Sequence, residues 1–463
     1  MFKELNMKII NQDNAKKIIY QLIPVLVFFI DPFNLNLAQR LVFSALLLTI
    51  IWWTTEFVKR DIACVFLLAV FLIFGSSTPY EVLKFAFSPS FYLIMLSFLL
   101  STGISNSKVA DRVASLVLKR YGETPIKLVL LSFLFGIVLV FIIPQPFSRV
   151  ILLSSIYSVF INAKTDNRDT KDVLLFSIFI SSTTTSMLFI NGDIILNYSA
   201  LQLGGIQIAA QEWLRVMFLP SLIANILVFF AFVLIFKSKL KADCFGSSTA
   251  AGTDGVKESK ISGKEISAAI IMLVVVLFWL TEALHGINAA IIAMIGVIAM
   301  FGAGVLSYKD IKTINTGLLL FLITVFAIGT VMKQSGISAL IFSKISSFMP
   351  DNNSAVYLLT LTIVVMTLHM FIGSSITTLS VAVPSLVQMT EGMVNPLVVV
   401  LLCYVAVSMH YIFPFHHVTI MIGAANKFYS DKLVMKFGLV LTIITIVSLL
   451  GLYIPWWKMI GLL

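Results

Sequence analysis

Long apolar runs divide almost the whole chain, and no other feature constrains its fold as strongly. They lie near residues 18–33, 41–58, 62–76, 88–107, 128–160, 173–199, 214–236, 266–284, 287–304, 315–332, 354–390, 394–424 and 437–457. Most are close to the roughly 20 residues that a helix needs to cross a bilayer, and they lack the alternation of membrane β-strands. We therefore predict an all-α polytopic membrane protein of the cell (inner or plasma) membrane, in contact with the lipid bilayer.

The runs at 128–160 and 354–390 are too long for one span and too short for two. Each is broken near its middle, the first by Pro144-Gln145-Pro146 and the second by Gly373-Ser374-Ser375. Proline removes a helical hydrogen bond and glycine loosens the backbone. We interpret both as re-entrant hairpins, which leaves eleven transmembrane helices.

The distribution of basic residues supports this topology. With the N-terminus in the cytoplasm and the C-terminus outside, 25 of the 32 Lys and Arg fall in cytoplasmic segments, six in outer segments, and Arg149 inside a hairpin. Such a bias is the positive-inside pattern of membrane proteins. It also accounts for the formal net charge of +10, so no nucleic-acid partner is expected.

The chain repeats itself at about half its length. Residues 53–60 resemble residues 279–286 in sequence and in position between apolar runs, and Thr102-Gly103-Ile104-Ser105 is echoed by Ser335-Gly336-Ile337-Ser338. A polar, glycine-containing stretch at 237–265 separates the copies. Five core spans in each copy predict an inverted repeat, the architecture of alternating-access carriers.

The predicted organisation has four parts. They are an N-terminal segment with the first span (1–39), a first inverted repeat (40–236), a cytoplasmic linker (237–265) and a second inverted repeat (266–463).

The hairpin tips are the predicted substrate site, because broken helices expose unpaired amides at their N-terminal ends. Aligning the repeats places one tip opposite the other. The candidate substrate-binding residues of the tips are Gln145, Pro146, Phe147, Ser148, Arg149, Ser374, Ser375, Thr377 and Thr378.

Arg149 is the sharpest single candidate, since a guanidinium at mid-membrane costs roughly 2.5–3.5 kcal/mol on insertion scales. It binds an anionic substrate or stands in for a coupling cation. The alternative is that it snorkels to the interface or pairs with a neighbour such as Asp193.

Two further segments carry polar residues into apolar runs. Residues 181–186 are six consecutive hydroxyl residues, which either unwind the helix so that Thr184 and Thr185 line the site, or bond back to their own helix. Asn191 and Asp193 follow, and Asp193 is either a buried acid or the outer end of the span.

Histidines gather in the matching span of the second repeat. Pro414 with His416 and His417 suggests a broken helix in which one histidine contacts substrate or carries a proton, or is hydrogen-bonded in the core. His285, His369 and His410 are interpreted as structural. Glu56 and Glu282 are expected to cap or pair locally.

Signals for other classes of function are missing from the sequence. No HExxH, GxSxG, Walker or GxGxxG motif is present, so no enzyme is expected. Cys64, Cys244 and Cys403 lack paired spacing and are interpreted as free thiols, with no metal site and no cofactor.

Trp52-Trp53-Thr54-Thr55-Glu56 resembles the Trp-Trp-x-Thr-Glu signature of the divalent-anion/sodium symporter family, and residues 279–287 are similar to the opening of that family's second half. The resemblance covers about residues 40–457. It implies a homodimer, elevator-type motion of a transport part against a scaffold, and tips that contact substrate carboxylate and sodium. It assigns candidate ion-binding roles to Ser374, Ser375, Asn191 and Asp193.

The predicted function is secondary active transport of a small anion of the dicarboxylate, tricarboxylate or sulfate type, with Na+ as the coupling ion. The alternative is a cation-independent or proton-coupled exchanger in which Arg149 replaces a coupling ion. A channel and a membrane sensor are the remaining classes.

Overall fold

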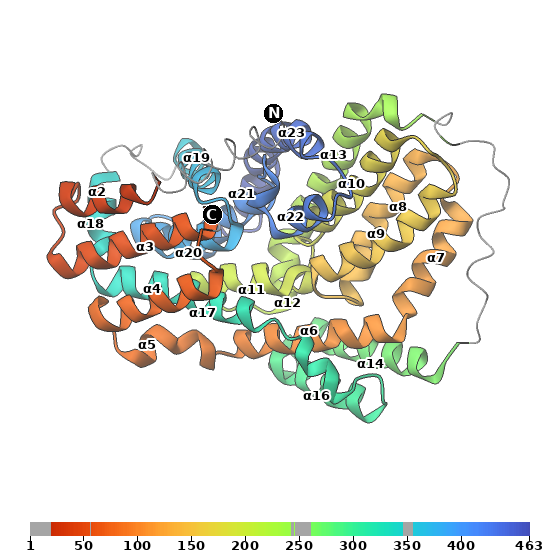
Figure 1. The fold of residues 1–463 in the computed structure, drawn as a ribbon, viewed down its shortest axis with the longest axis horizontal. Coiled ribbons are helices and arrows are strands. Elements are labelled where there is room, and N and C mark those ends of the chain that lie inside the picture. Colours follow the sequence, from red (N-terminus) through yellow and green to blue (C-terminus); the bar gives the residue numbers. More distant parts are fainter. Residues whose placement is uncertain (1–19, 56, 242–244, 246–260, 346–354) are drawn as a thin grey trace, which may run out of the picture.

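The computed structural model describes residues 20–55, 57–241, 245, 261–345 and 355–463, and the regular structure in these residues is helical (Figure 1). Seven helices of this part are long and apolar enough to cross a membrane. They are α3 (Leu37–Thr55), α6 (Pro89–Ser107), α12 to α13 (Ala210–Ile235), α14 (Gly263–Leu280), α17 (Thr316–Gln334), α19 (Ala355–Ile372) and α23 to α24 (Asp431–Met459).

The other helices complete each half. Those of the first half are α4 (Arg60–Phe74), α5 (Pro79–Leu83), α7 (Val109–Tyr121), α8 (Pro125–Val138), α9 (Pro146–Asn162), α10 (Arg168–Thr185) and α11 (Ile194–Leu203). Those of the second half are α15 (Glu282–His285), α16 (Ala289–Gly302), α18 (Ile337–Ile345), α20 (Ser375–Met389), α21 (Pro396–Ser408) and α22 (Val418–Ala425).

The first predicted span, 18–33, is not seen as a full membrane crossing. Its described part holds α2 (Leu22–Ile30), which has nine residues, fewer than half of those that a spanning helix needs. This helix lies against α3. The count of eleven spans therefore stays a prediction.

Both over-long apolar runs are pairs of helices that break where the sequence predicts. In the first, α8 and the short 3₁₀ turn η2 (Leu139–Phe141) end before Pro146, which occupies the first turn of α9 and needs no N–H partner there. The Tyr157 hydroxyl of α9 donates to the Leu128 carbonyl of α8 at 3.1 Å, so α9 returns toward the start of α8, and α10 packs against both helices. In the second, Gly373 between α19 and α20 has φ +69°, a conformation that favours glycine.

Corresponding helices of the two halves begin at a nearly constant separation. Leu37 of α3 and Gly263 of α14 are 226 residues apart, and Pro125 of α8 and Ala355 of α19 are 230 apart. The pairs α4 and α16, α6 and α17, α7 and α18, α9 and α20, and α10 and α21 fall between these values.

Contacts between the halves come in exchanged pairs. Helix α4 packs against α17, and the corresponding α16 packs against α6. Helices α11 and α22 correspond as well, since they begin 224 residues apart. Helix α11 packs against α20 as α22 does against α9, and α10 contacts α22 as α21 contacts α11. The two halves therefore contact each other extensively, through matching pairs of helices.

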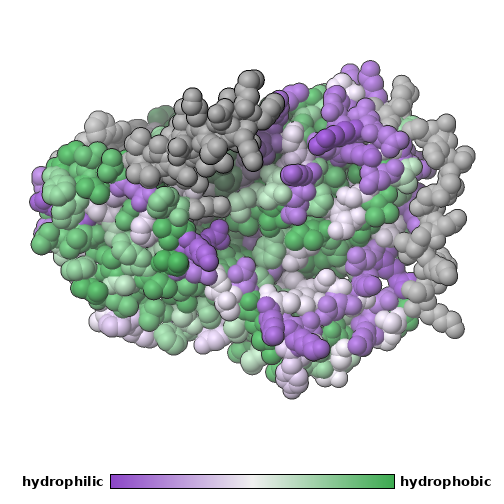
Figure 2. Space-filling model, in the orientation of Figure 1, coloured by the Kyte–Doolittle hydropathy of each residue, from purple (hydrophilic) through white to green (hydrophobic). Residues whose placement is uncertain are grey.

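Buried apolar side chains form one large cluster and one small one. The small cluster joins α3, α4 and α5 to α17 and α18, at the left of Figure 1. Figure 2 shows a mostly hydrophobic surface there, whereas hydrophilic side chains gather at the right of the view and at its lower edge. An apolar surface of this kind suits lipid contact.

Candidate functional site

Arg149 connects three interruptions of the helical backbone. Its side chain is fully buried. One terminal nitrogen donates to the Ile143 carbonyl at 2.7 Å, and the other donates to Ser186 Oγ at 2.7 Å and to the Gly192 carbonyl at 2.8 Å. These acceptors lie at the first hairpin tip, just past the end of α10, and in the 3₁₀ turn η3 (Ile190–Asp193). The guanidinium thus neutralises backbone dipoles that helix breaks leave unpaired.

Asp193 is a buried acid, 7% exposed, and not an exposed span end. Its carboxylate accepts the Leu196 amide at the start of α11 and acts electrostatically on Arg149. The Nδ2 atom of the neighbouring Asn191 is buried without a partner in the described residues.

The hydroxyl run at 181–186 does not unwind the helix, so that expectation is wrong. Helix α10 continues through Thr185, and Thr184 and Thr185 donate to the carbonyls of Ile180 and Ser181 one turn earlier. Thr184 also donates to Asn225 of α13 at 2.7 Å. Both threonines are fully buried in helix packing, and their contact with substrate stays a prediction.

The first tip is fixed to α6. Gln145, fully buried, donates from Nε2 to Ser97 Oγ at 2.7 Å, and the ring centroid of Phe147 lies 6.0 Å from that of Phe98. Pro146 is buried, whereas Phe147 and Ser148 are half-buried.

The second tip is fixed to α3 and to the segment after α21. Thr54, from the Trp-Trp-Thr-Thr-Glu segment, donates to the Ile372 carbonyl at 3.1 Å. Ser375 Oγ donates to the His416 carbonyl at 3.1 Å, and Thr377 donates to Ser374 Oγ at 3.1 Å.

Thr378 of the same helix donates to the Ser374 carbonyl. Glu56, at the end of the Trp-Trp-Thr-Thr-Glu segment, lies outside the described residues, as does Cys244.

Histidines surround this second tip. His416, in the 3₁₀ turn η9 (Pro414–His416), is fully buried and accepts the Ile412 amide at Nδ1. His417 accepts the Thr419 amide and so caps α22. His369, at the end of α19, faces the His416 carbonyl at 3.0 Å. The broken helix predicted at Pro414 is therefore present.

The helices that leave the two tips both begin without a side-chain cap. Neither Gln145 before α9 nor Ser374 before α20 makes a side-chain cap, whereas Asp193 caps α11 and His417 caps α22. Uncapped helix N-termini carry partial positive charge and free amide donors, which favour an anion.

The four predicted ion-binding residues fall into two groups. Asn191 and Asp193 belong to the first tip beside Arg149, and Ser374 and Ser375 belong to the second. The described residues contain no group of three or more His, Cys, Asp or Glu arranged to hold a metal ion, and Cys64 and Cys403 are buried free thiols.

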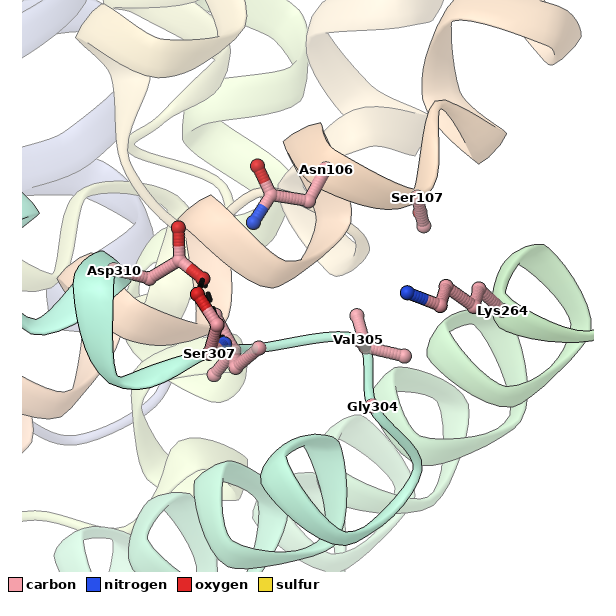
Figure 3. Close-up of a pocket in the computed structure, with 8 residues that line it drawn as sticks. Asn106, Ser107, Lys264, Gly304, Val305, Ser307 and Asp310 are labelled. Carbon is pink, nitrogen blue, oxygen red and sulfur yellow. Dashed lines mark hydrogen bonds between the residues drawn. The ribbon is translucent and has the colours of Figure 1, made fainter.

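A cavity of about 330 Å³ lies away from the tips (Figure 3). It is formed by the end of α6, the start of α14 and the segment after α16, and Lys264 extends into it. Hydrogen bonds from the Ser307 backbone and hydroxyl lower the pKa of Asp310 on its wall. None of the predicted site residues lines this cavity.

The sequence did not predict most of the groups that hydrogen-bond to the two hairpin tips. Ser97 and the backbone carbonyls around Arg149 carry no sequence signal. Ser186 is the last residue of the hydroxyl run, and Thr54 lies in the recognised segment, so both could have been found. His369 and His410 were interpreted as structural, although they lie at the second tip.

Comparison with known proteins identifies the family of the chain. A family model described as "Sodium:sulfate symporter transmembrane region" matches residues 11–463. A Bacillus subtilis (strain 168) protein described as "Putative malate transporter YflS" is 21% identical over 321 residues, which cover 65% of this chain and 67% of the relative. The resemblance drawn from the Trp-Trp-Thr-Thr-Glu segment is confirmed. The chain is therefore a multi-pass membrane protein of the sodium:sulfate symporter family, a family of transporters and not of enzymes.

Proposed function

We propose that the protein is a secondary active transporter that carries a small anion, of the dicarboxylate, tricarboxylate or sulfate type, by alternating access. The observation that carries this proposal is the pair of uncapped helix N-termini, one at each hairpin tip. Family membership and the relative described as a malate transporter support an anionic substrate.

The exchanged contacts between the halves support an inverted repeat. Helix α4 corresponds to α16, and α6 corresponds to α17. If an approximate two-fold axis relates the two halves, the contact of α4 with α17 must be matched by a contact of α16 with α6, and both contacts are observed. Such an axis lets the same contacts form on either side of the membrane in turn, which is what alternating access requires. Elevator motion, the homodimer and the cytoplasmic N-terminus remain parts of the proposal.

A cation-independent or proton-coupled exchanger is a second candidate, and the placement of Arg149 favours it. Its guanidinium already binds two carbonyls and a hydroxyl where the backbone is interrupted. Oxygen atoms of this kind are also the ligands of a hard cation. In this second candidate, the fixed positive charge of Arg149 takes the place of a coupling ion in the first repeat.

The test is uptake into proteoliposomes that contain the purified full-length protein. Labelled malate, succinate, citrate and sulfate are offered with sodium and proton gradients imposed separately, and with or without unlabelled anion inside. Saturable uptake with counterflow of at least one anion supports a carrier. Flux without saturation or counterflow indicates a channel, and no flux of any anion rejects the proposal.

Uptake that requires internal anion but no sodium gradient selects the exchanger. Uptake that follows the sodium gradient selects the symporter instead.

A further inference from the structure

Another cavity lies between the two halves of the chain, away from the hairpin tips. Its volume is about 210 Å³, and it is found at the opposite end of α6 and α14 from the cavity of Figure 3. Its wall is formed by the start of α6, the end of α11 with the loop that follows, α15 and the start of α16. None of the predicted substrate-binding or ion-binding residues lines it.

Among the described residues of that wall, Glu282 of α15 alone carries a charge. Its carboxylate is half-buried and accepts the Ala289 amide at the start of α16, but it makes no ion pair within the described part of the chain. The nearby His285 is neutral, because its Nδ1 accepts the Ile287 amide and its Nε2 donates to the Phe278 carbonyl. A half-buried carboxylate that no cation faces favours a positively charged ligand.

Three uncharged polar side chains line the same space. They are Ser90, Tyr198 and Gln202, all half-buried. Their side chains make no hydrogen bond to another described residue, and Glu282 acts electrostatically on Tyr198, so the phenol and the carboxylate are neighbours. Unused polar groups that converge on a cavity with apolar walls are typical of a small-molecule site.

The size of the cavity and its apolar wall distinguish an organic cation from a metal ion. A water molecule takes up about 30 Å³ in the liquid, so a bare metal ion would leave most of the cavity unfilled. Leu93, Leu201 and Ile206 also line it, and they suit a short hydrocarbon chain. A primary ammonium group has three N–H donors, which match a carboxylate, a hydroxyl and an amide oxygen.

The two helix N-termini at the wall do not make this an anion site. Helices α6 and α16 begin there, but the side chain of Ser88 caps the first and that of Asn288 caps the second. The Glu282 carboxylate also lies at the start of α16, where it would repel an anion. No Lys or Arg is present in the described wall to offset it.

We propose that this cavity binds a small primary amine in its ammonium form, with Glu282 as the counter-charge and Tyr198 and Gln202 as hydrogen-bond partners. It is a second ligand site, separate from the hairpin tips and independent of the proposed carrier function. A bound amine contacts both halves of the chain, because α6 and α11 belong to the first and α15 and α16 to the second. The predicted topology places this end of α14 outside, so the amine arrives from outside the cell.

Binding to the purified full-length protein in detergent tests the proposal without transport. n-Butylammonium chloride is titrated at constant ionic strength, and binding is followed by calorimetry and by thermal unfolding, since a ligand of the folded state raises the unfolding temperature. We expect saturable binding of n-butylammonium. Neither n-butanol, which lacks the charge, nor sodium chloride, which lacks the hydrocarbon, should give a saturable effect.

Three variants locate the site. Glu282→Gln removes the charge but keeps an oxygen for the Ala289 amide, and it should weaken n-butylammonium binding about tenfold or more. Tyr198→Phe removes only a hydroxyl and should weaken binding about two- to tenfold. Glu212→Gln is the matched control, because it removes the same charge from α12, which packs against α15, at a residue that does not line the cavity. It should bind as wild type does.

The proposal is overturned if n-butylammonium does not bind, or if n-butanol or sodium chloride has the same saturable effect. Wild-type affinity in Glu282→Gln overturns it as well, and so does an equal loss in Glu212→Gln, which would indicate only a diffuse negative potential. If Glu282→Gln does not fold, Tyr198→Phe and the comparison of the three solutes in wild type still decide the matter. Failure of the carrier function in the uptake assay leaves this result untouched.

Discussion

Single residues at the first tip act mainly by holding the backbone. Arg149 was predicted as an anion ligand or a substitute for a cation, with pairing to Asp193 as the alternative. The structure shows its terminal nitrogens occupied by two carbonyls and one hydroxyl. Its charge is opposed by Asp193, so under the proposed function the helix N-termini are the predicted contacts of the anion.

This arrangement makes Arg149→Ala a destabilising change. It leaves the buried Ile143 and Gly192 carbonyls without their charged donor, and each buried polar group left unsatisfied costs about 1–3 kcal/mol. Arg149→Lys keeps the charge but loses the forked geometry, so it should cost less. Chemical unfolding in detergent measures the stability of both variants, and malate uptake is measured in parallel. An Arg149→Ala protein as stable as wild type but without uptake would instead identify Arg149 as a substrate ligand.

At the scale of elements, α8 and α10 approach each other closely at Gly136. A Cβ atom there would lie 2.5 Å from Thr185 Oγ1 and 3.2 Å from the Ser181 carbonyl. The hydroxyl run of α10 thus does what small polar residues do in membrane helices, since it allows near contact of two helices.

Gly136→Ala should therefore destabilise the protein by about 1–3 kcal/mol through overpacking. Gly302→Ala is the matched control, because no atom lies within 4 Å of a Cβ at that helix end. We expect the control to unfold at the wild-type temperature or slightly above it. Thermal unfolding followed by circular dichroism compares the two variants with wild type. An equal drop in unfolding temperature for both variants would exclude a specific contact at Gly136.

The elements themselves were largely predictable, and the site only in part. Apolar runs and the breakers at Pro146 and Gly373 located the hairpins, because these depend on local chemistry. Whether residues 181–186 unwind could not be decided locally, since hydroxyls satisfy either their own helix or a neighbour. The contacts of Arg149 depend partly on Ser186 and Gly192 in a later segment, and the proximity of the His369 and His410 rings depends on how α19 meets the end of α21.

At the scale of the whole molecule, the two halves are bound to each other near the linker. Arg112 of α7 and Glu265 of α14 form an ion pair at 2.8 Å, and Thr102 of α6 meets Thr313 at 2.9 Å. The linker side is also where the basic segments lie, which predicts that it faces the cytoplasm.

Cysteine labelling tests that orientation. In a background without Cys64, Cys244 and Cys403, a cysteine at Lys309 should react with an impermeant maleimide only after the cells are opened. A cysteine at Lys458 should react in intact cells, because the C-terminal end is predicted to lie outside. Labelling of both positions from the same side would refute the predicted topology.

The exchanged packing of α4 on α17 and of α16 on α6 has a consequence for biosynthesis. The ribosome finishes the first half before the helices of the second half exist. The first-half helices must therefore stay in the lipid with the surfaces that later contact the second half still exposed. Two separately expressed fragments, cut between residues 246 and 260, should accordingly find each other and restore a working protein, whereas neither fragment alone should survive quality control.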